Sequence, residues 1–113
     1  MQYLLLIYSA ESAEENLDQP KLMAEYGAFT QGIIQSGHFK SADRLRRIAD
    51  ATTVRVRDGR TLTTDGPFAE TREQLGGYYL IDAKNLDEAI GIAAKVPTAR
   101  YGSIEVRPIW STS

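Results

Sequence analysis

The 113-residue sequence contains no cysteine and only one histidine, His38. A chain without cysteine can form neither disulfide bonds nor thiolate metal sites. A single imidazole also excludes a metal centre built from several histidines, so we expect neither a metal nor a cofactor. Any acid–base chemistry would therefore depend on carboxylates, on tyrosines or on His38 itself.

The sequence also lacks long apolar segments and an excess of basic residues. The apolar stretch at residues 1–8 has no basic flank and is far shorter than the ~20 residues that a membrane-spanning helix requires. We therefore expect a cytoplasmic protein that does not contact a membrane. The formal net charge of -2 argues against direct binding to nucleic acid, because proteins that bind nucleic acid usually present a basic surface.

Arginine, by contrast, is concentrated in one part of the chain. Six arginines lie between positions 44 and 60, namely Arg44, Arg46, Arg47, Arg55, Arg57 and Arg60. One interpretation is the solvated face of a hairpin, which is where exposed arginine is usually found. The alternative is a subsite for an anionic ligand, because guanidinium groups match carboxylates and phosphates.

The first strand is expected at residues 2–8, with apolar side chains on both of its faces. Alternation directs the side chains of Tyr3, Leu5 and Ile7 to one face and those of Leu4, Leu6 and Tyr8 to the other. Residues 9–18 are small and acidic without any period, which predicts a loop.

An amphipathic helix is predicted from Pro20 to Ser36, with Asp18 as its N-cap and Gly37 as the left-handed residue after its last turn. Its apolar side chains recur at helical spacing at Leu22, Tyr26, Phe29 and Ile33. A second helix is predicted over residues 86–94, capped by Asn85. The remaining strands are expected at residues 38–48, 52–57, 60–64, 77–81 and 103–110, with Asp58-Gly59 as a hairpin turn.

This order of elements predicts an α+β fold of the ferredoxin-like βαββαβ type, in a single domain at residues 1–113, with residues 52–64 as an added hairpin. Both helices of such a fold cover the same face of the sheet. The strands at residues 2–8 and 77–81 are nevertheless apolar on both faces, and water is a poor partner for the uncovered one. We therefore expect a homodimer in which two sheets pack face to face.

The most distinctive stretch runs from Thr64 to Ile81 and begins with the turn Asp65-Gly66-Pro67-Phe68. The double glycine Gly76-Gly77 precedes a strand, so it does not resemble a phosphate loop, and a bulge or a close backbone approach is the expected role. Together with residues 53–59 and 102–108, this stretch resembles the YCII-related family, and in particular its branch named for the Asp-Gly-Pro-Phe tetrapeptide.

The resemblance implies a dimeric α/β barrel with a cleft in each subunit. Members of this branch often accompany extracytoplasmic-function sigma factors, which implies a signalling role or a small-molecule sensor linked to a sigma-factor system. Related YCII proteins are regarded as enzymes because a histidine on a helix and an aspartate face a pocket. This sequence departs from that pattern, because its first predicted helix contains no histidine and His38 lies just beyond the helix end.

Asp65 and His38 are the candidate catalytic residues. Asp65 is either a structural cap that binds backbone amides of its own turn or a carboxylate at the mouth of a pocket. His38 either interacts with free carbonyls at the helix end or transfers protons. Phe68 is expected to act as an apolar anchor.

The candidate ligand-binding residues are Arg44, Glu70, Arg72, Tyr78 and Tyr79. Glu70 and Arg72 either meet a polar ligand or are simply solvated. Tyr78 and Tyr79 project to opposite faces of one strand, so one of them is expected in the core or the interface while the other reaches the cleft.

Three functions fit these observations. The first is a homodimer that binds an unknown small molecule, linked to sigma-factor signalling. The second is a cofactor-independent enzyme that acts on a small polar or aromatic acid through Asp65 and His38. The third is a protein-interaction module that uses the arginine-rich hairpin.

Overall fold

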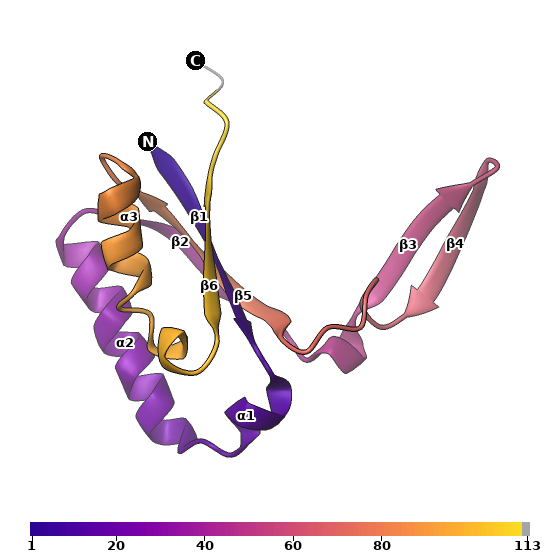
Figure 1. Cartoon of the computed structure of the whole chain (residues 1–113), viewed down its shortest axis with the longest axis horizontal. Helices are drawn as coiled ribbons and strands as arrows, with labels where there is room; N and C mark the ends of the chain where they lie inside the picture. Colours follow the sequence, from indigo (N-terminus) through magenta and orange to yellow (C-terminus); the bar gives the residue numbers. More distant parts are fainter. Residues whose placement is uncertain (112–113) are drawn as a thin grey trace.

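The computed structural model describes residues 1–111 and contains the strands and helices in the predicted order (Figure 1). The strands are β1 (Gln2–Ser9), β2 (Phe39–Arg44), β3 (Thr52–Arg57), β4 (Arg60–Asp65), β5 (Gln74–Asp82) and β6 (Ser103–Pro108). The helices are α1 (Glu11–Glu15), α2 (Gln19–Gln35) and α3 (Leu86–Ala93), with short 3-10 turns η1 (Ile48–Asp50) and η2 (Pro97–Arg100). None of the described helices is both long and apolar enough to span a membrane.

Four strands form one antiparallel sheet in the order β2-β5-β1-β6. This is the strand order of a ferredoxin-like βαββαβ unit, and α2 and α3 lie together on one side of it (Figure 1). Pro108 ends β6, which is an edge strand, so its missing N–H breaks no ladder. The α+β class is therefore confirmed.

The core lies between the helices and one face of the sheet. Alternation in β1 buries Tyr3, Leu5 and Ile7, as the sequence predicts. Leu5 and Ile81 are fully buried, and Ile33 of α2 packs in the same cluster. Hydrophobic burial of this kind is the main favourable term in holding the two layers together.

The opposite face of the sheet is apolar at its centre and is called the open face below. It carries Leu4, Leu6 and Tyr8 from β1 and Tyr78 and Leu80 from β5, none of which is fully buried. Polar residues of the edge strands flank this centre, because Asp43 pairs with Tyr78 and Glu105 pairs with Leu6.

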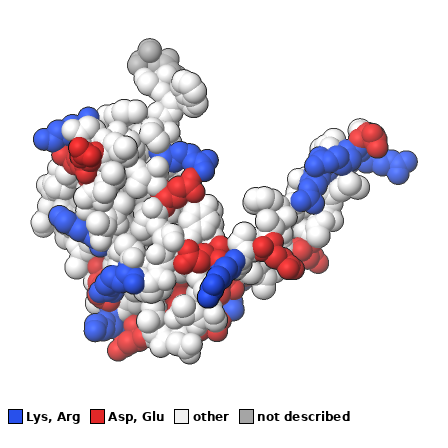
Figure 2. All heavy atoms as spheres, in the orientation of Figure 1, with Lys and Arg blue, Asp and Glu red and all other residues white. Residues whose placement is uncertain are grey.

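Strands β3 and β4 form a separate two-stranded sheet, the arm, that stands away from the body of the molecule (Figures 1 and 2). Asp58 and Gly59 both have positive φ, 51° and 73°, which is the geometry expected of this hairpin turn. Val54 and Val56 share one face of the arm and are mostly exposed. Figure 2 shows basic side chains gathered at the tip.

Three local predictions differ from the structure. The expected loop at residues 9–18 contains α1, whose first turn carries Glu11 and Glu14 at the positive end of the helix. The expected strand at residues 38–48 ends at Arg44, because Glu11 accepts a hydrogen bond from the backbone of Ile48 and so draws the chain toward α1. The last strand, expected at residues 103–110, ends at Pro108, so Trp110 lies beyond β6 and is 93% exposed.

Candidate ligand-binding site

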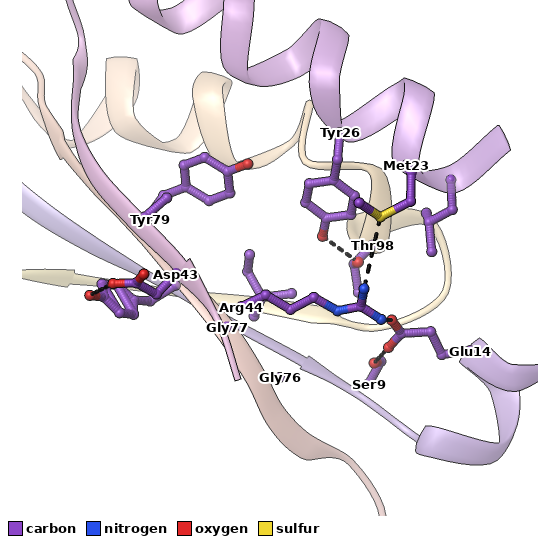
Figure 3. A pocket seen from close by; sticks show the side chains of 14 residues that line it. Ser9, Glu14, Met23, Tyr26, Asp43, Arg44, Gly76, Gly77, Tyr79 and Thr98 are labelled. Atoms are coloured by element: carbon purple, nitrogen blue, oxygen red, sulfur yellow. Dashed lines mark hydrogen bonds and ion pairs between the residues drawn. The ribbon is translucent and has the colours of Figure 1, made fainter. Parts of the chain in front are cut away.

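A cavity of about 230 Å³ lies between the N-terminal half of α2 and the helix-covered face of the sheet (Figure 3). We call it the inner hollow. Leu22, Met23 and Tyr26 of α2 form one wall, and Ile7, Ala42 and Tyr79 of the sheet contribute to the other. The remaining lining residues are Ser9, Glu14, Asp43, Arg44, Gly76, Gly77, Tyr78 and Thr98.

The double glycine shapes the sheet side of the inner hollow. Ile7 pairs with Gly77 and Tyr8 with Leu75, so Gly76 is the extra residue of a β-bulge. A Cβ atom on Gly77 would lie 2.9 Å from the Asp43 carbonyl oxygen, so only glycine lets β2 approach β5 this closely. The predicted bulge and the predicted close approach are both present.

Two pairs of neutral hydroxyls lie at or beside the inner hollow and form hydrogen bonds. The hydroxyl of Tyr26 lies 2.5 Å from Oγ1 of Thr98, and Thr98 itself is buried. Burial raises the pKa of Tyr26 to about 12, so its phenol stays protonated near neutral pH. Between helix α2 and the sheet, the hydroxyls of Thr30 and Tyr79 lie 2.6 Å apart.

Opposite charges stand at the mouth of the hollow. Nη2 of Arg44 lies 3.7 Å from Oε1 of Glu14, which is an ion pair outside hydrogen-bond distance. Glu14 is held from the other side by Ser9, whose Oγ donates to Oε2 at 3.1 Å. The remaining described contact of the guanidinium is a weak one to the sulfur of Met23 at 3.8 Å. Arg44 therefore keeps most of its five N–H donors available.

A second, more polar hollow of about 310 Å³ adjoins the first. We call it the outer hollow. It shares Ser9, Glu14, Arg44 and Gly76 with the inner hollow, so the Arg44–Glu14 pair stands where the two meet. Its other lining residues are mostly charged or amide-bearing: Glu11, Glu15, Gln19, Leu45, Arg46, Arg47, Gln74 and Leu75.

Comparison with known proteins places this fold in a family. The sequence profile of the YCII-related domain matches residues 1–113. The chain belongs to the YCII-related family. It is also similar to an uncharacterized protein of Rhizobium meliloti (strain 1021), with 39% identity over 114 residues that cover 96% of this chain and 92% of that protein.

Three of the predicted ligand-binding residues of this YCII-related chain border the inner hollow, namely Arg44, Tyr78 and Tyr79. Only two of them turn their side chains toward it, because the side chain of Tyr78 lies on the open face. Tyr79 points toward α2, whereas the hydroxyl of Tyr78 donates to Oδ2 of Asp43 at 2.6 Å. This hydrogen bond is the main reason why the pKa of Tyr78 is raised above its usual value. Asp43 lies on the far side of the strand from Tyr79 (Figure 3), so the two tyrosines face opposite sides as predicted.

The other predicted residues lie elsewhere. Glu70 and Arg72 are exposed between β4 and β5, outside the lining of the inner hollow. Asp65 ends β4 in the arm, and within residues 1–111 its carboxylate has no hydrogen-bond or ion-pair partner. Within the described residues Asp65 therefore fills neither of its two expected roles, since it neither caps its own turn nor lines one of the two hollows. Phe68 is 79% exposed, so the apolar anchor expected at this position does not form within residues 1–111.

Backbone groups close the Asp-Gly-Pro-Phe turn instead. Gly66 has a φ of 98°, which strongly favours glycine. Its N–H donates to the carbonyl of Ala51 at 2.7 Å, and its own carbonyl accepts from Oγ1 of Thr53 at 2.8 Å. The turn therefore ties the base of the arm together.

His38 connects the end of α2 with the start of α3. Its Nδ1 lies 2.6 Å from Oγ of Ser36 and its Nε2 lies 2.9 Å from Oε1 of Glu88. The carbonyl of His38 bonds Asp82 at the far end of β5, whereas the arm that carries Asp65 precedes the start of β5. A strand of this length spans roughly 25 Å, so a single chain does not bring His38 and Asp65 together.

Several lining residues had no signal in the sequence. Glu14 and Ser9 fall where a featureless loop was expected, and Tyr26 reads as one more apolar position of a helix. The described residues contain no cluster of three or more metal-binding side chains. The lining of the inner hollow therefore combines one cation, the two carboxylate residues Glu14 and Asp43, several hydroxyls and apolar walls.

Proposed function

We propose that this YCII-related protein is a homodimer that binds a small molecule in the inner hollow of each subunit. The observation that carries the proposal is the hollow itself, which has apolar walls and a few convergent polar groups. Ligand sites in proteins commonly combine these two features. Its volume of about 230 Å³ suits a molecule with a single ring or a branched aliphatic chain.

The open face supports the dimer. Leu6, Tyr78 and Leu80 are neighbours at its centre, and both helices pack on the other side of the sheet. In a dimer related by a two-fold axis, the open face of one subunit would pack on the open face of the other, so the same residues of both subunits would be covered. Two sheets packed in this way would form the dimeric α/β barrel.

The same two strands connect the ligand site with the proposed interface. β1 and β5 present Ile7 and Tyr79 to the inner hollow and Leu6 and Tyr78 to the open face. A ligand that favours one arrangement of these strands would also change the dimer contact, which is the property that a sensor needs. We further propose that the protein belongs to the Asp-Gly-Pro-Phe branch of the family and acts in sigma-factor signalling. Such a role would place the protein in the cytoplasm, where transcription occurs.

A cavity-filling variant tests the ligand site. Ala42 lines the inner hollow from β2, so Ala42→Phe should fill it with a ring. A panel of small metabolites would be screened for a rise in the melting temperature, and a ligand present at 100 times its Kd stabilises the fold by about 2.7 kcal/mol. Compounds that stabilise the wild type should not stabilise Ala42→Phe, whereas Arg57→Gln at the tip of the arm should behave like the wild type. Stabilisation that survives in Ala42→Phe would contradict the assignment of the site.

A further inference from the structure

The Arg44–Glu14 pair is the only place where the two hollows bring opposite charges to a shared boundary within the described residues. Neither Arg44 nor Glu14 uses its full hydrogen-bonding capacity in this pair. The two groups are 3.7 Å apart, and the Arg44 side chain is 67% exposed. Exposed ion pairs of this kind contribute little to stability. Separating them to admit a ligand therefore costs little, provided that the ligand satisfies both charges.

The position of Glu14 is defined independently of Arg44. Ser9 is buried at the end of β1, and its hydroxyl holds Oε2 of Glu14. Oε1 is the oxygen that faces Arg44 and that a ligand could take over. The boundary therefore presents a carboxylate oxygen in a fixed position beside a guanidinium group that has N–H donors available.

This arrangement discriminates between classes of ligand by charge. A monoanion on Arg44 would bring its carboxylate beside the carboxylate of Glu14, and like charges at this distance repel. A monocation on Glu14 would meet the same conflict with Arg44. A zwitterion meets neither, because each of its charges faces the opposite charge of the site.

The inner hollow determines which uncharged part of a ligand can bind. Leu22, Met23 and Ile7 give it apolar walls, and a cavity of 150 Å³ lined by such side chains is known to admit benzene. The hollow of about 230 Å³ is therefore large enough for an aromatic or branched aliphatic side chain. The protonated Tyr26 and its partner Thr98 add neutral hydroxyls to the lining, so they add no charge to that of Arg44 and Glu14.

We propose that the site binds a small α-amino acid with an apolar side chain. The carboxylate lies on Arg44, the ammonium group lies on Oε1 of Glu14, and the side chain enters the inner hollow while the charged end remains at the boundary with the outer one. This inference rests on the proposed function and narrows its ligand to one chemical class.

The test compares one amino acid with analogues that each lack one charge. The probes are L-phenylalanine, phenethylamine, 3-phenylpropionate and toluene, titrated into the full-length protein. Calorimetry gives the Kd, and the methyl resonances of Leu22 and Met23 report whether a probe enters the inner hollow. The variants are Arg44→Gln, Glu14→Gln and the control Arg57→Gln, each with its fold checked by circular dichroism. Glutamine at position 14 keeps an oxygen that can accept the Ser9 hydrogen bond.

A hydrogen bond to a charged group is worth enough to change affinity roughly tenfold or more. L-Phenylalanine should therefore bind the wild type at least about tenfold more tightly than either single-charge analogue. Arg44→Gln should remove its advantage over phenethylamine, Glu14→Gln should remove its advantage over 3-phenylpropionate, and Arg57→Gln should keep both. Equal or tighter binding of either analogue to the wild type would overturn the proposal.

Toluene separates this inference from the proposed function. If toluene shifts the methyl resonances and L-phenylalanine does not bind, the hollow admits ligands but the amino-acid class is refuted. If none of the four probes shifts these resonances, both the ligand class and the proposed ligand site are refuted.

Discussion

Leu6 lies at the centre of the open face and gives the sharpest test of the proposed dimer. It sits on the central strand β1, opposite Tyr78 on one side and Glu105 on the other. Full burial of one leucine side chain is worth about 1.5–3 kcal/mol. Leu6 is already half-buried in the single chain, so a two-fold axis would bury at most roughly a third of each side chain in addition. Leu6→Glu should therefore remove about 1–2 kcal/mol of hydrophobic association free energy over the two copies, which weakens the dimer by roughly 5–30-fold. A carboxylate in the interface adds a desolvation penalty in the same direction.

Analytical ultracentrifugation across a range of micromolar concentrations measures this effect. Leu6 is not part of the buried core cluster, so the variant should remain folded by circular dichroism while it becomes monomeric. Leu86→Glu is the matched control, because Leu86 is 48% exposed on α3 and lies on the other side of the sheet. A wild-type protein that sediments as a monomer, or a Leu6→Glu variant that dissociates no more readily than the control, would refute the reasoning.

Three further predictions concern stability. Gly77→Ala should lower the melting temperature because its Cβ atom meets the Asp43 carbonyl oxygen, at a cost of about 1–3 kcal/mol typical of overpacking. Its matched control is Gly91→Ala in α3, where the space around the glycine is open, and this variant should instead stabilise the fold by up to about 1 kcal/mol. The pKa of Glu88 is held below its usual value of 4.5, chiefly by the backbone N–H of Lys84. Its carboxylate therefore stabilises the fold above pH 4.5, and Glu88→Gln should lower the melting temperature at pH 7 by an amount that shrinks as the pH falls below 4.5. Asp65→Asn should change the free energy of unfolding by less than about 0.5 kcal/mol, and a loss above 1 kcal/mol would reveal a contact that the single chain does not make.

The local elements followed from short-range chemistry in the sequence. Asp18 caps α2 by accepting a hydrogen bond from Lys21, and Asn85 caps α3 through Glu88, as their positions predict. Gly37 has the expected positive φ after the last turn of α2. These features depend on a few neighbouring residues, so their signals are present in any window of the chain.

The candidate site was predicted only in part. The sequence predicts Arg44 and Tyr79, which line the inner hollow, and Tyr78, whose side chain lies on the open face. Glu14 lies in a stretch without any period, which gives no signal of a site. Whether a charged side chain lines a cavity depends on the path of segments that are distant in sequence. Ser9 and Glu14 reach Arg44 only because α1 folds back against the ends of β1 and β2.

Local patterns in the sequence were sufficient for the α+β class and for the order of strands and helices along the chain. The sequence also carries the membership of the YCII-related family. Those properties are encoded by periodicity, caps and turn residues, which act over a few positions. By contrast, long-range folding places the Asp-Gly-Pro-Phe turn at the base of an exposed arm and the Arg44–Glu14 pair between two hollows. Both outcomes depend on long-range packing, because an exposed carboxylate and one at the mouth of a cavity look the same along the chain.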